Sequence, residues 1–503
     1  KDSVATNVNH CFAYSTNIRG TGKLAVITPT YGHNFGTVDG DSTLGTGTLY
    51  LQSGNMPAGN FTLFLDCAGN GTLEYGGSGS YTLILNGITT LPNLTTSGTG
   101  TRVLPNTDLV ICNRLKISGP TLNNSVSNRK LTINGSMERY NTGAFLSGSG
   151  STATVTFSGT SAQTLGGTTG NFIGANAFNN LEVNNSAGLI IGNNGNIEVN
   201  GNLLLTNGVI TTSSTNSLSI LNTAASAVIP TGGSSSSYIS GPLKKQIING
   251  GSFIYPLGKG AVSGHTFTLT SSSSGTSTFT AEYFTPNATS TSLTSPLLYL
   301  NSKEFWSVTT TGSKTAKMAW DSQSDLNGTM TQNGITDLQA AEYNSGTSSW
   351  VGLTSTTSGS NNAGDVSTTA NVNLSTSTKN YSIGSITVTK PTATLSPLGA
   401  VCGTAGIPVT FTSSVPITLN YTLSYKLNGV AQTPIVVTAL PFTLPTPTPG
   451  TYQLTGFTYN NSSLAGAVDG TIVTDYATPT TSVAGANQSP CNATSLNLPG
   501  NTP

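Results

Sequence analysis

The feature that most constrains the fold of this chain is a run of short apolar segments separated by turn residues. Residues 178–220 read FNNLEVNNSAGLIIGNNGNIEVNGNLLLTNGVITTSSTNSLSI. The apolar segments begin about six to nine residues apart, and the turns between them are rich in Asn, Gly, Ser and Thr. The segments are Leu181–Val183, Leu189–Ile191, Ile197–Val199, Leu203–Leu205, Val209–Ile210 and Leu218–Ile220.

Each full triad has two apolar positions that flank a variable middle position, which is the period of two of a β-strand. Hairpins would give a similar alternation, but their two-residue turns usually carry a specific signal such as Asn-Gly. The spacing of the triads is more typical of successive faces of a coil. We therefore expect residues 1–235 to form a parallel β-helix, because stacked coils bury the apolar face that one coil cannot bury alone.

The same pattern occurs earlier in the chain at a nearly constant offset. Three matched pairs are 109–117 with 197–205 (offset 88), 92–94 with 179–181 (offset 87), and 72–77 with 154–159 (offset 82). We interpret them as two copies of a unit of 80–90 residues, each several coils long. Paired asparagines at 179–180, 184–185 and 193–194 are expected at turns, where Asn tolerates a positive φ and its amide can bond to the next coil.

Composition supports an all-β chain and excludes several partners. Charged residues make up 7% of the sequence, hydrophobic residues 35%, and there are 59 glycines. Eighteen basic and eighteen acidic residues cancel, and the densest basic spot is Lys244–Lys245. Nucleic-acid binding needs a basic surface that displaces counterions, so it is excluded. No apolar run approaches the length of a membrane span.

The second half has a different pattern, with longer alternating runs and all three tryptophans. Residues 236–388 include FTAEYF, EFWSV and KMAW, which predict an antiparallel β-sandwich with an aromatic core. Residues 389–478 carry six or seven short strand patterns at the spacing of an immunoglobulin-like sandwich. Residues 479–503 are expected to begin a further repeat. Because the chain starts at Lys1 without a leader, it is interpreted as a mature product or a fragment.

Five cysteines (Cys11, Cys67, Cys112, Cys402 and Cys491) lack the close spacing of a zinc site. The favoured interpretation is that they are small buried hydrophobes. One or two disulfides are the alternative, which a secreted setting would permit.

The order of these segments resembles the large surface proteins that Bacteroidota export by the type IX system, including SprB-like gliding adhesins. The resemblance rests on the TLEYGGSG and FNNLEVNNS…NGNLLLTNGVI coils and on the YISGPLKK…FIYPLGKG…EFW…MAWD sandwich. It continues in ATLSPLGAVCGTAG…PGTYQLTGFTYN and VAGANQSPCNATSLNLPGN, which look like Ig/PKD-like repeats. It implies export to the cell surface and a role in adhesion or gliding motility. The usual C-terminal sorting domain is not visible.

Parallel β-helices also include polysaccharide-cleaving enzymes, which place carboxylates together on one outer face. Glu182 and Glu198 occupy middle positions of two triads, and Asp39 with Asp41 is the tightest carboxylate pair. Solvated strand and turn positions explain all four. The histidines (His10, His33 and His265) are widely separated, and each is predicted to be an ordinary loop or strand residue. We therefore predict that the chain has no catalytic residues and is not an enzyme.

Two modest site predictions remain. Asp321, Asp325 and Asn327 offer oxygen donors in one short loop and are candidate ligands for Ca²⁺, although the full EF-hand set is lacking. No other cofactor is expected. Ser3 and Ser42 lie in Asp-Ser-Val and Asp-Ser-Thr triplets, which resemble the O-glycosylation site of exported Bacteroidota proteins.

The working hypothesis is an extracellular stalk or adhesin segment. Expected partners are surface polysaccharide or other cell-surface and matrix components, the secretion and motility machinery, and a second copy of the chain through self-association. Two rival hypotheses are a structural subunit of an extracellular filament or sheath, and a carbohydrate-binding or polysaccharide-cleaving β-helix.

Overall fold

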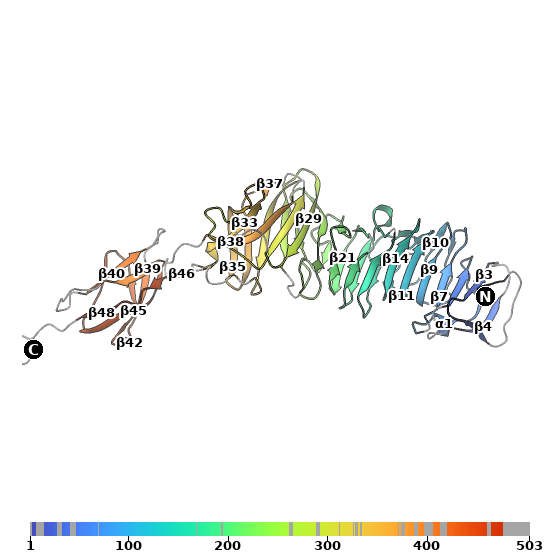
Figure 1. The fold of residues 1–503 in the computed structure, drawn as a ribbon, viewed down its shortest axis with the longest axis horizontal. Helices are drawn as coiled ribbons and strands as arrows, with labels where there is room; N and C mark the ends of the chain where they lie inside the picture. Colours follow the sequence, from blue (N-terminus) through green and yellow to red (C-terminus); the bar gives the residue numbers. More distant parts are fainter. Residues whose placement is uncertain are drawn as a thin grey trace, which may run out of the picture. The chain divides into compact units, whose positions relative to one another are not determined.

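A computed structural model describes most of the chain (Figure 1). The described residues are 3–6, 15–27, 33–40, 47–68, 70–168, 170–192, 195–260, 265–287, 292–310, 312–324, 326, 330–331, 334–370, 372–373, 378–386, 391–396, 406–412, 420–459 and 464–475.

The chain is all-β, as predicted, with 54% strand and 3% helix. It divides into two compact units. The first contains residues 1–326 and 338–384, and the second contains residues 327–337 and 385–503.

The first unit begins with a β-solenoid of about nine turns, which confirms the predicted parallel β-helix. One strand per coil stacks in parallel register on the strand of the coil before it. The order along this ladder is β1 (Ser3–Thr6), β3 (Lys23–Val26), β5 (Thr48–Leu51), β7 (Thr72–Tyr75), β9 (Thr90–Thr96), β11 (Leu109–Ser118), β13 (Leu131–Ile133), β16 (Thr154–Phe157), β18 (Asn180–Asn184), β21 (Leu203–Asn207) and β24 (Val228–Ile229).

The ladder divides in two at β11. The register of β11 on β9 shifts between Ile111 and Arg114, and β11 then pairs with both β13 and β14. The second branch contains β14 (Ser136–Tyr140), β17 (Gln163–Gly166), β19 (Leu189–Ile191), β22 (Ile210–Thr211) and β25 (Ile239–Ser240). A separate sheet contains β8 (Tyr81–Thr82), β10 (Thr101–Val103), β12 (Thr121–Asn123) and β15 (Ala144–Leu146).

The solenoid core is a column of aligned apolar side chains, one from each coil. Leu49 aligns with Leu73, Leu73 with Leu94, Leu94 with Leu115 and Leu115 with Met137, and all five are fully buried. Parallel, in-register pairing brings the same position of each triad inward, so burial of this column is the main stabilising contribution. Successive members are 24, 21, 21 and 22 residues apart, which sets the coil length.

This coil length gives the 80–90-residue offsets a structural meaning. Thr72 in β7 and Thr154 in β16 are four steps apart along the ladder, so an offset of 82 spans four coils. The two segments of the other match, 109–117 and 197–205, do not occupy equivalent strands. Residues 109–117 lie within one strand, β11, whereas residues 197–205 contribute to β20 (Ile197–Val199) and β21, which belong to different sheets.

The predicted asparagine bonds between coils are present. Asn180 Nδ2 donates to the Gly150 carbonyl at 3.0 Å, and Asn185 Nδ2 donates to the Ser161 carbonyl at 2.8 Å. The predicted positive φ is wrong for residues 179, 180, 184 and 185, since Asn180 and Asn184 are the ends of strand β18. Residues 193–194 lie outside the described part. Left-handed backbone occurs instead at Asn70, Asn86, Asn128 and Asn141.

Strand β26 (Leu243–Ile248) is the main connection between the solenoid and the sandwich. It pairs in parallel with β23 (Leu218–Ile220) of the last coils and antiparallel with β29 (Thr276–Phe284) of the sandwich. The Gly258 amide also donates to the Ile239 carbonyl at 3.1 Å, so the sandwich pairs with β25 as well. The sandwich therefore pairs with open edges of the last coils.

The sandwich has two mainly antiparallel sheets, as predicted from residues 236–388. One continues from β29 through β31 (Phe305–Thr310), β38 (Lys379–Ser385), β33 (Leu338–Asn344) and β34 (Ser349–Leu353). The other contains β27 (Ser252–Tyr255), β28 (Phe267–Ser271), β32 (Ser313–Trp320), β36 (Ala363–Thr368) and β35 (Ser355–Ser360). Trp306 and Trp350 are fully buried, and the Trp306 ring stacks on Phe267 with centroids 5.9 Å apart.

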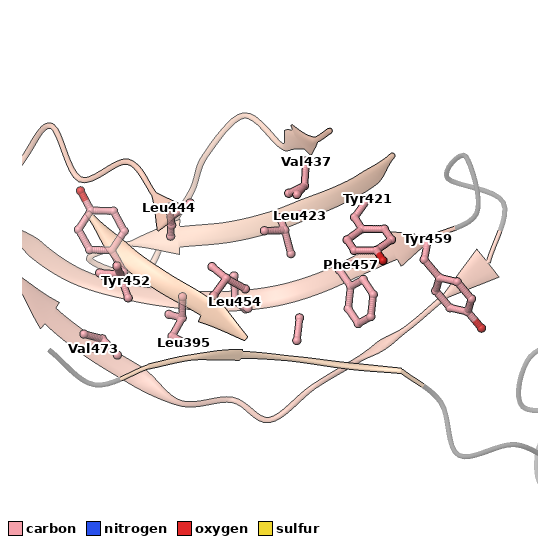
Figure 2. Close-up of a cluster of buried hydrophobic side chains, with 13 residues drawn as sticks. Leu395, Tyr421, Leu423, Val437, Leu444, Tyr452, Leu454, Phe457, Tyr459 and Val473 are labelled. Atoms are coloured by element: carbon pink, nitrogen blue, oxygen red, sulfur yellow. The ribbon is translucent and has the colours of Figure 1, made fainter. Parts of the chain in front are cut away.

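The second unit is a smaller two-sheet sandwich. One sheet contains β39 (Thr392–Leu395), β40 (Ile407–Thr412), β44 (Phe442–Leu444) and β47 (Ala467–Val468), and the other is built on β41 (Tyr421–Leu427) and β45 (Gly450–Tyr459). Figure 2 shows the apolar side chains of its core, among them Leu395, Leu423, Leu454 and Phe457. Residues 479–503, predicted to begin a further repeat, lie outside the described residues.

Candidate functional sites

The two candidate carboxylates of the solenoid do not form a pair. Glu182 lies on β18 in the main ladder, and Glu198 lies on β20 in a different sheet. Glu198 Oε2 accepts the Gly174 amide at 2.7 Å. Asp41 lies outside the described residues, and so does the side chain of Asp39.

Glu182 is held as an anion by its neighbours. Its carboxylate accepts hydrogen bonds from Thr156 at 2.7 Å, Thr206 at 3.0 Å and Lys130 at 3.2 Å. Partial burial raises the pKa of Glu182, but these three hydrogen bonds outweigh it and bring the pKa below its ordinary value. A carboxyl with a lowered pKa is a poor proton donor at neutral pH.

The prediction that His265 is an ordinary residue is wrong, because the structure places it in a buried cluster between the sheets of the sandwich. His265 Nδ1 lies 2.6 Å from Glu304 Oε2, and His265 Nε2 lies 3.5 Å from Asp321 Oδ1. The side chains of His265 and Glu304 are 1% and 0% exposed, whereas that of Asp321 is 43% exposed. The imidazole therefore connects a buried carboxylate with one that reaches solvent.

Other polar groups fix this arrangement. Tyr283 donates to Glu304 Oε2 at 2.8 Å, and its ring stacks on the imidazole with centroids 5.3 Å apart. Asn301 Nδ2 donates to Glu304 Oε1 at 3.3 Å. Ser324 Oγ lies 3.3 Å from His265 Nδ1. Both carboxylate oxygens of Glu304 thus have polar partners, as a buried carboxylate requires.

Opposing effects act on His265. Burial lowers its pKa, but the hydrogen bond to Glu304 and the charges of Glu304 and Asp321 raise it, and the net direction is upward. The Nε2 atom is buried and makes no hydrogen bond, since Asp321 is too far away for one.

The residues of this cluster are far apart in the sequence, so their spacing did not predict it. Glu304 is 39 residues and Asp321 is 56 residues from His265, so no local motif relates them. The three share one feature, which is that each lies just outside an aromatic strand end. His265 precedes Phe267 of β28, Glu304 precedes Phe305 of β31, and Asp321 follows Trp320 of β32. Polar residues at the ends of strands with aromatic side chains were the signal that could have found it.

The proposed calcium ligands fall mostly outside the described part. Asp321 is described, whereas Asp325 and Asn327 are not. Within the described ranges, no group of three or more His, Cys, Asp or Glu residues is arranged to hold a metal ion. Of the two glycosylation candidates, Ser3 opens β1 opposite Lys23, and Ser42 lies beyond the described ranges.

Two cysteines form a disulfide. Cys67 is bonded to Cys112, so the favoured interpretation of buried hydrophobes is wrong for this pair. The bond joins the short helix α1 region (Thr62–Leu65) to the point where β11 divides. Cys11, Cys402 and Cys491 lie outside the described residues.

An open pocket of about 500 Å³ lies beside this disulfide. Its lining crosses successive coils and carries amide and hydroxyl groups without a charged side chain. The lining residues are Cys67, Cys112, Asn113, Asn134, Gly135, Ser158, Gly159, Thr160 and Ser161.

Arg102 is a fully buried cation, and its guanidinium occupies a cage of backbone carbonyls. Its Nη2 atom donates to Gly76 at 2.7 Å and to Gly77 and Ser97 at 2.9 Å each. Its Nη1 atom donates to Gly79 and Thr99. The guanidinium also lies 4.4 Å from the centre of the Tyr81 ring. Arg102 thereby satisfies the polar groups of the GGSG turn in the preceding coil.

No protein-family model, curated protein or solved structure matches this chain. Among the helices that the structure describes, none is long and apolar enough to cross a membrane.

Proposed function

We propose that this chain is a segment of a large extracellular surface protein that mediates adhesion or gliding, of the SprB-like type exported by Bacteroidota. In this proposal the first unit forms a rigid spacer that carries a contact surface for cell-surface or matrix polysaccharide. The secretion and motility machinery would act on other parts of the protein.

The observation that carries the proposal is the uninterrupted backbone ladder of the first unit. Nine coils stacked at the usual strand separation of about 4.8 Å extend over roughly 40 Å. Beside this ladder, a second sheet of the last coils (β20 and β23) continues through β26 into the sandwich without a flexible linker. A stiff body of this kind can hold a binding surface at a distance from its point of attachment, and its hydrogen-bonded strands keep the residues of that surface in fixed positions.

Charge on the outer strand positions is largely paired. Lys23 contacts Glu74 at 2.9 Å, and Arg114 contacts Glu138 at 2.5 Å. Such pairing leaves only a weak electrostatic field to attract a polyanion, and the net charge of the chain is zero. A neutral polysaccharide, which is recognised through hydroxyl and amide groups, fits this surface better. The uncharged pocket beside the disulfide is the best candidate contact point.

The test is retention of protein-coated beads under flow on agarose, which is neutral, on alginate, which is anionic, and on bare glass. We expect retention on agarose without release of reducing sugar ends. Thr160→Arg, which places a charge at the exposed rim of the pocket, should reduce retention, whereas Thr142→Arg, at an exposed turn outside the pocket lining, should not.

Other outcomes would favour the rival functions. Release of sugar ends that is lost in Glu182→Gln would indicate a polysaccharide-cleaving enzyme. Assembly into filaments in solution, with no retention on any surface, would indicate a filament or sheath subunit. Equal retention on agarose and bare glass would contradict a specific polysaccharide contact.

A further inference from the structure

The His265 cluster has the arrangement of a histidine that is prepared to bind a metal ion. Metal-binding histidines almost always donate one ring N–H to a carboxylate or carbonyl, which fixes the tautomer and aims the other nitrogen at the metal. Glu304 provides this contact, because its Oε2 atom lies 2.6 Å from His265 Nδ1 and it is itself held by Tyr283 and Asn301. The opposite nitrogen, Nε2, is buried and has no hydrogen-bond partner.

The distance from Nε2 to Asp321 fits a shared metal ion better than a hydrogen bond. An N–H···O bond brings its heavy atoms to about 2.7–3.2 Å, whereas the observed separation is 3.5 Å. Two ligands that each lie about 2.0–2.1 Å from a tetrahedral ion are about 3.4 Å apart. Ligands at right angles around a small octahedral ion such as Mg²⁺, with bonds of the same length, would be closer, at about 3 Å.

We propose that His265 Nε2 and Asp321 Oδ1 bind a divalent metal ion of the class that prefers imidazole and tetrahedral geometry, such as Zn²⁺. Water completes the coordination, since the Asp321 side chain is 43% exposed and leaves one side of the site open. Glu304 is a positioning residue that orients the imidazole. An oxygen-seeking ion such as Ca²⁺ is disfavoured by the nitrogen ligand.

The ion would fasten the end of β32 to the core of the sandwich. His265 precedes β28, Asp321 follows β32, and these two strands are paired along their length. A metal bound only by the folded state stabilises that state, and the stabilisation grows with the logarithm of the free metal concentration once this exceeds the dissociation constant.

The experiment is titration of the full, untagged chain with ZnCl₂ in a calorimeter, after dialysis against EDTA, with the visible spectrum of Co²⁺ as a second readout. We expect one ion per chain and the absorption bands of tetrahedral Co²⁺. Asp321→Asn should weaken Zn²⁺ binding at least tenfold and His265→Gln should abolish it. Asp108→Asn, which changes an exposed carboxylate of the solenoid, should bind like the unaltered chain.

Asp321→Asn decides the matter even if His265→Gln fails to fold, because the Asp321 side chain is partly exposed. Its folding is checked by circular dichroism in EDTA. The proposal is overturned if no Zn²⁺ binding is detected at Zn²⁺ concentrations up to about 1 mM, which is the range of weak, non-specific affinity. It is equally overturned if Asp321→Asn binds as tightly as the unaltered chain, or if Ca²⁺ binds while Zn²⁺ does not.

Discussion

Lys245 of β26 lies in register with Ile220 of β23, and this parallel pair joins the sandwich to the last coils of the solenoid. Lys245 is fully buried, its ammonium donates to the Asn222 and Gln246 carbonyls, and burial lowers its pKa to about 8. The two halves of the first unit therefore share one sheet and one buried interface. We expect the edge of the last coil to depend on β26 for its stability.

Truncation of a buried side chain in this strand should weaken both halves. Leu243 is fully buried and aligns with Leu218 on one side and Ala281 on the other. Leu243→Ala should lower the free energy of unfolding of the first unit by about 2–5 kcal/mol, because it leaves a cavity at the join. Urea unfolding measures the change. Val430→Ala, at an exposed position of the second unit, is the control and should have no effect on the first.

Removal of the buried Arg102 guanidinium should lower the stability of the first unit. Arg102→Met would remove the guanidinium donor from the carbonyls of Gly79, Ser97 and Thr99, at a cost of about 3 kcal/mol or more. Thermal unfolding followed by circular dichroism measures this loss. Arg114→Ala is the comparison, since Arg114 is 44% exposed and its ion pair with Glu138 contributes at most about 1 kcal/mol. Equal effects of the two substitutions would contradict the role of the carbonyl cage.

A buried lysine of the sandwich should make stability depend on pH. The Lys314 ammonium has no hydrogen bond and faces the Tyr381 ring, with Glu342 and Lys379 as its charged neighbours. Burial, the largest cause, lowers the pKa of Lys314 to about 7, and repulsion by Lys379 adds to it against the attraction of Glu342. Below pH 7 the ammonium is charged in both folded and unfolded chains, so its full burial cost is present.

Between pH 7 and the ordinary lysine value, the unfolded chain binds one proton more than the folded chain, so the stability of the sandwich rises with pH. Lys314→Met should therefore stabilise the sandwich at pH 6 by a few kcal/mol, since one pKa unit corresponds to about 1.4 kcal/mol. The difference between variant and unaltered chain should shrink as the pH approaches 10. Tryptophan fluorescence during urea unfolding reports the sandwich, which contains all three tryptophans. A difference that stays constant with pH would contradict the lowered pKa.

The disulfide should stabilise the first coils. Cys67 and Cys112 are 45 residues apart, and a cross-link of that span stabilises a fold by about 2–4 kcal/mol, largely through the unfolded state. Reduction with dithiothreitol should lower the unfolding temperature of the solenoid. The double variant Cys67→Ser, Cys112→Ser should show the same loss and no further response to reductant. A variant that still responds would place the relevant disulfide elsewhere.

Much of the fold follows from local pattern. The triad Leu181–Val183 predicts strand β18 because two of its three residues face inward, and the predicted strand differs from the observed one by only one residue at each end. The aromatic runs around Trp306 and Trp320 predict the sandwich for the same reason. These features depend on side-chain period, which the sequence displays directly.

Long-range contacts could not be predicted in this way. The pairing of Cys67 with Cys112 depends on how loops pass over the coils, and spacing alone leaves several connectivities open. Arg102 is buried because backbone carbonyls of another coil surround it, and no side-chain pattern reports carbonyl positions. His265 meets its carboxylates only after strands from two sheets have packed together. Sites built from residues on different strands therefore remained hidden, while the strands themselves were predicted.

The most direct test of the continuous ladder is hydrogen exchange measured along the native chain by mass spectrometry. We predict that backbone amides of residues 243–248 exchange as slowly as those of β23 and β29, because β26 is a central strand with partners on both sides. Fast exchange across residues 243–248, between two slowly exchanging neighbours, would show that the solenoid and the sandwich are separate bodies and would contradict the rigid spacer.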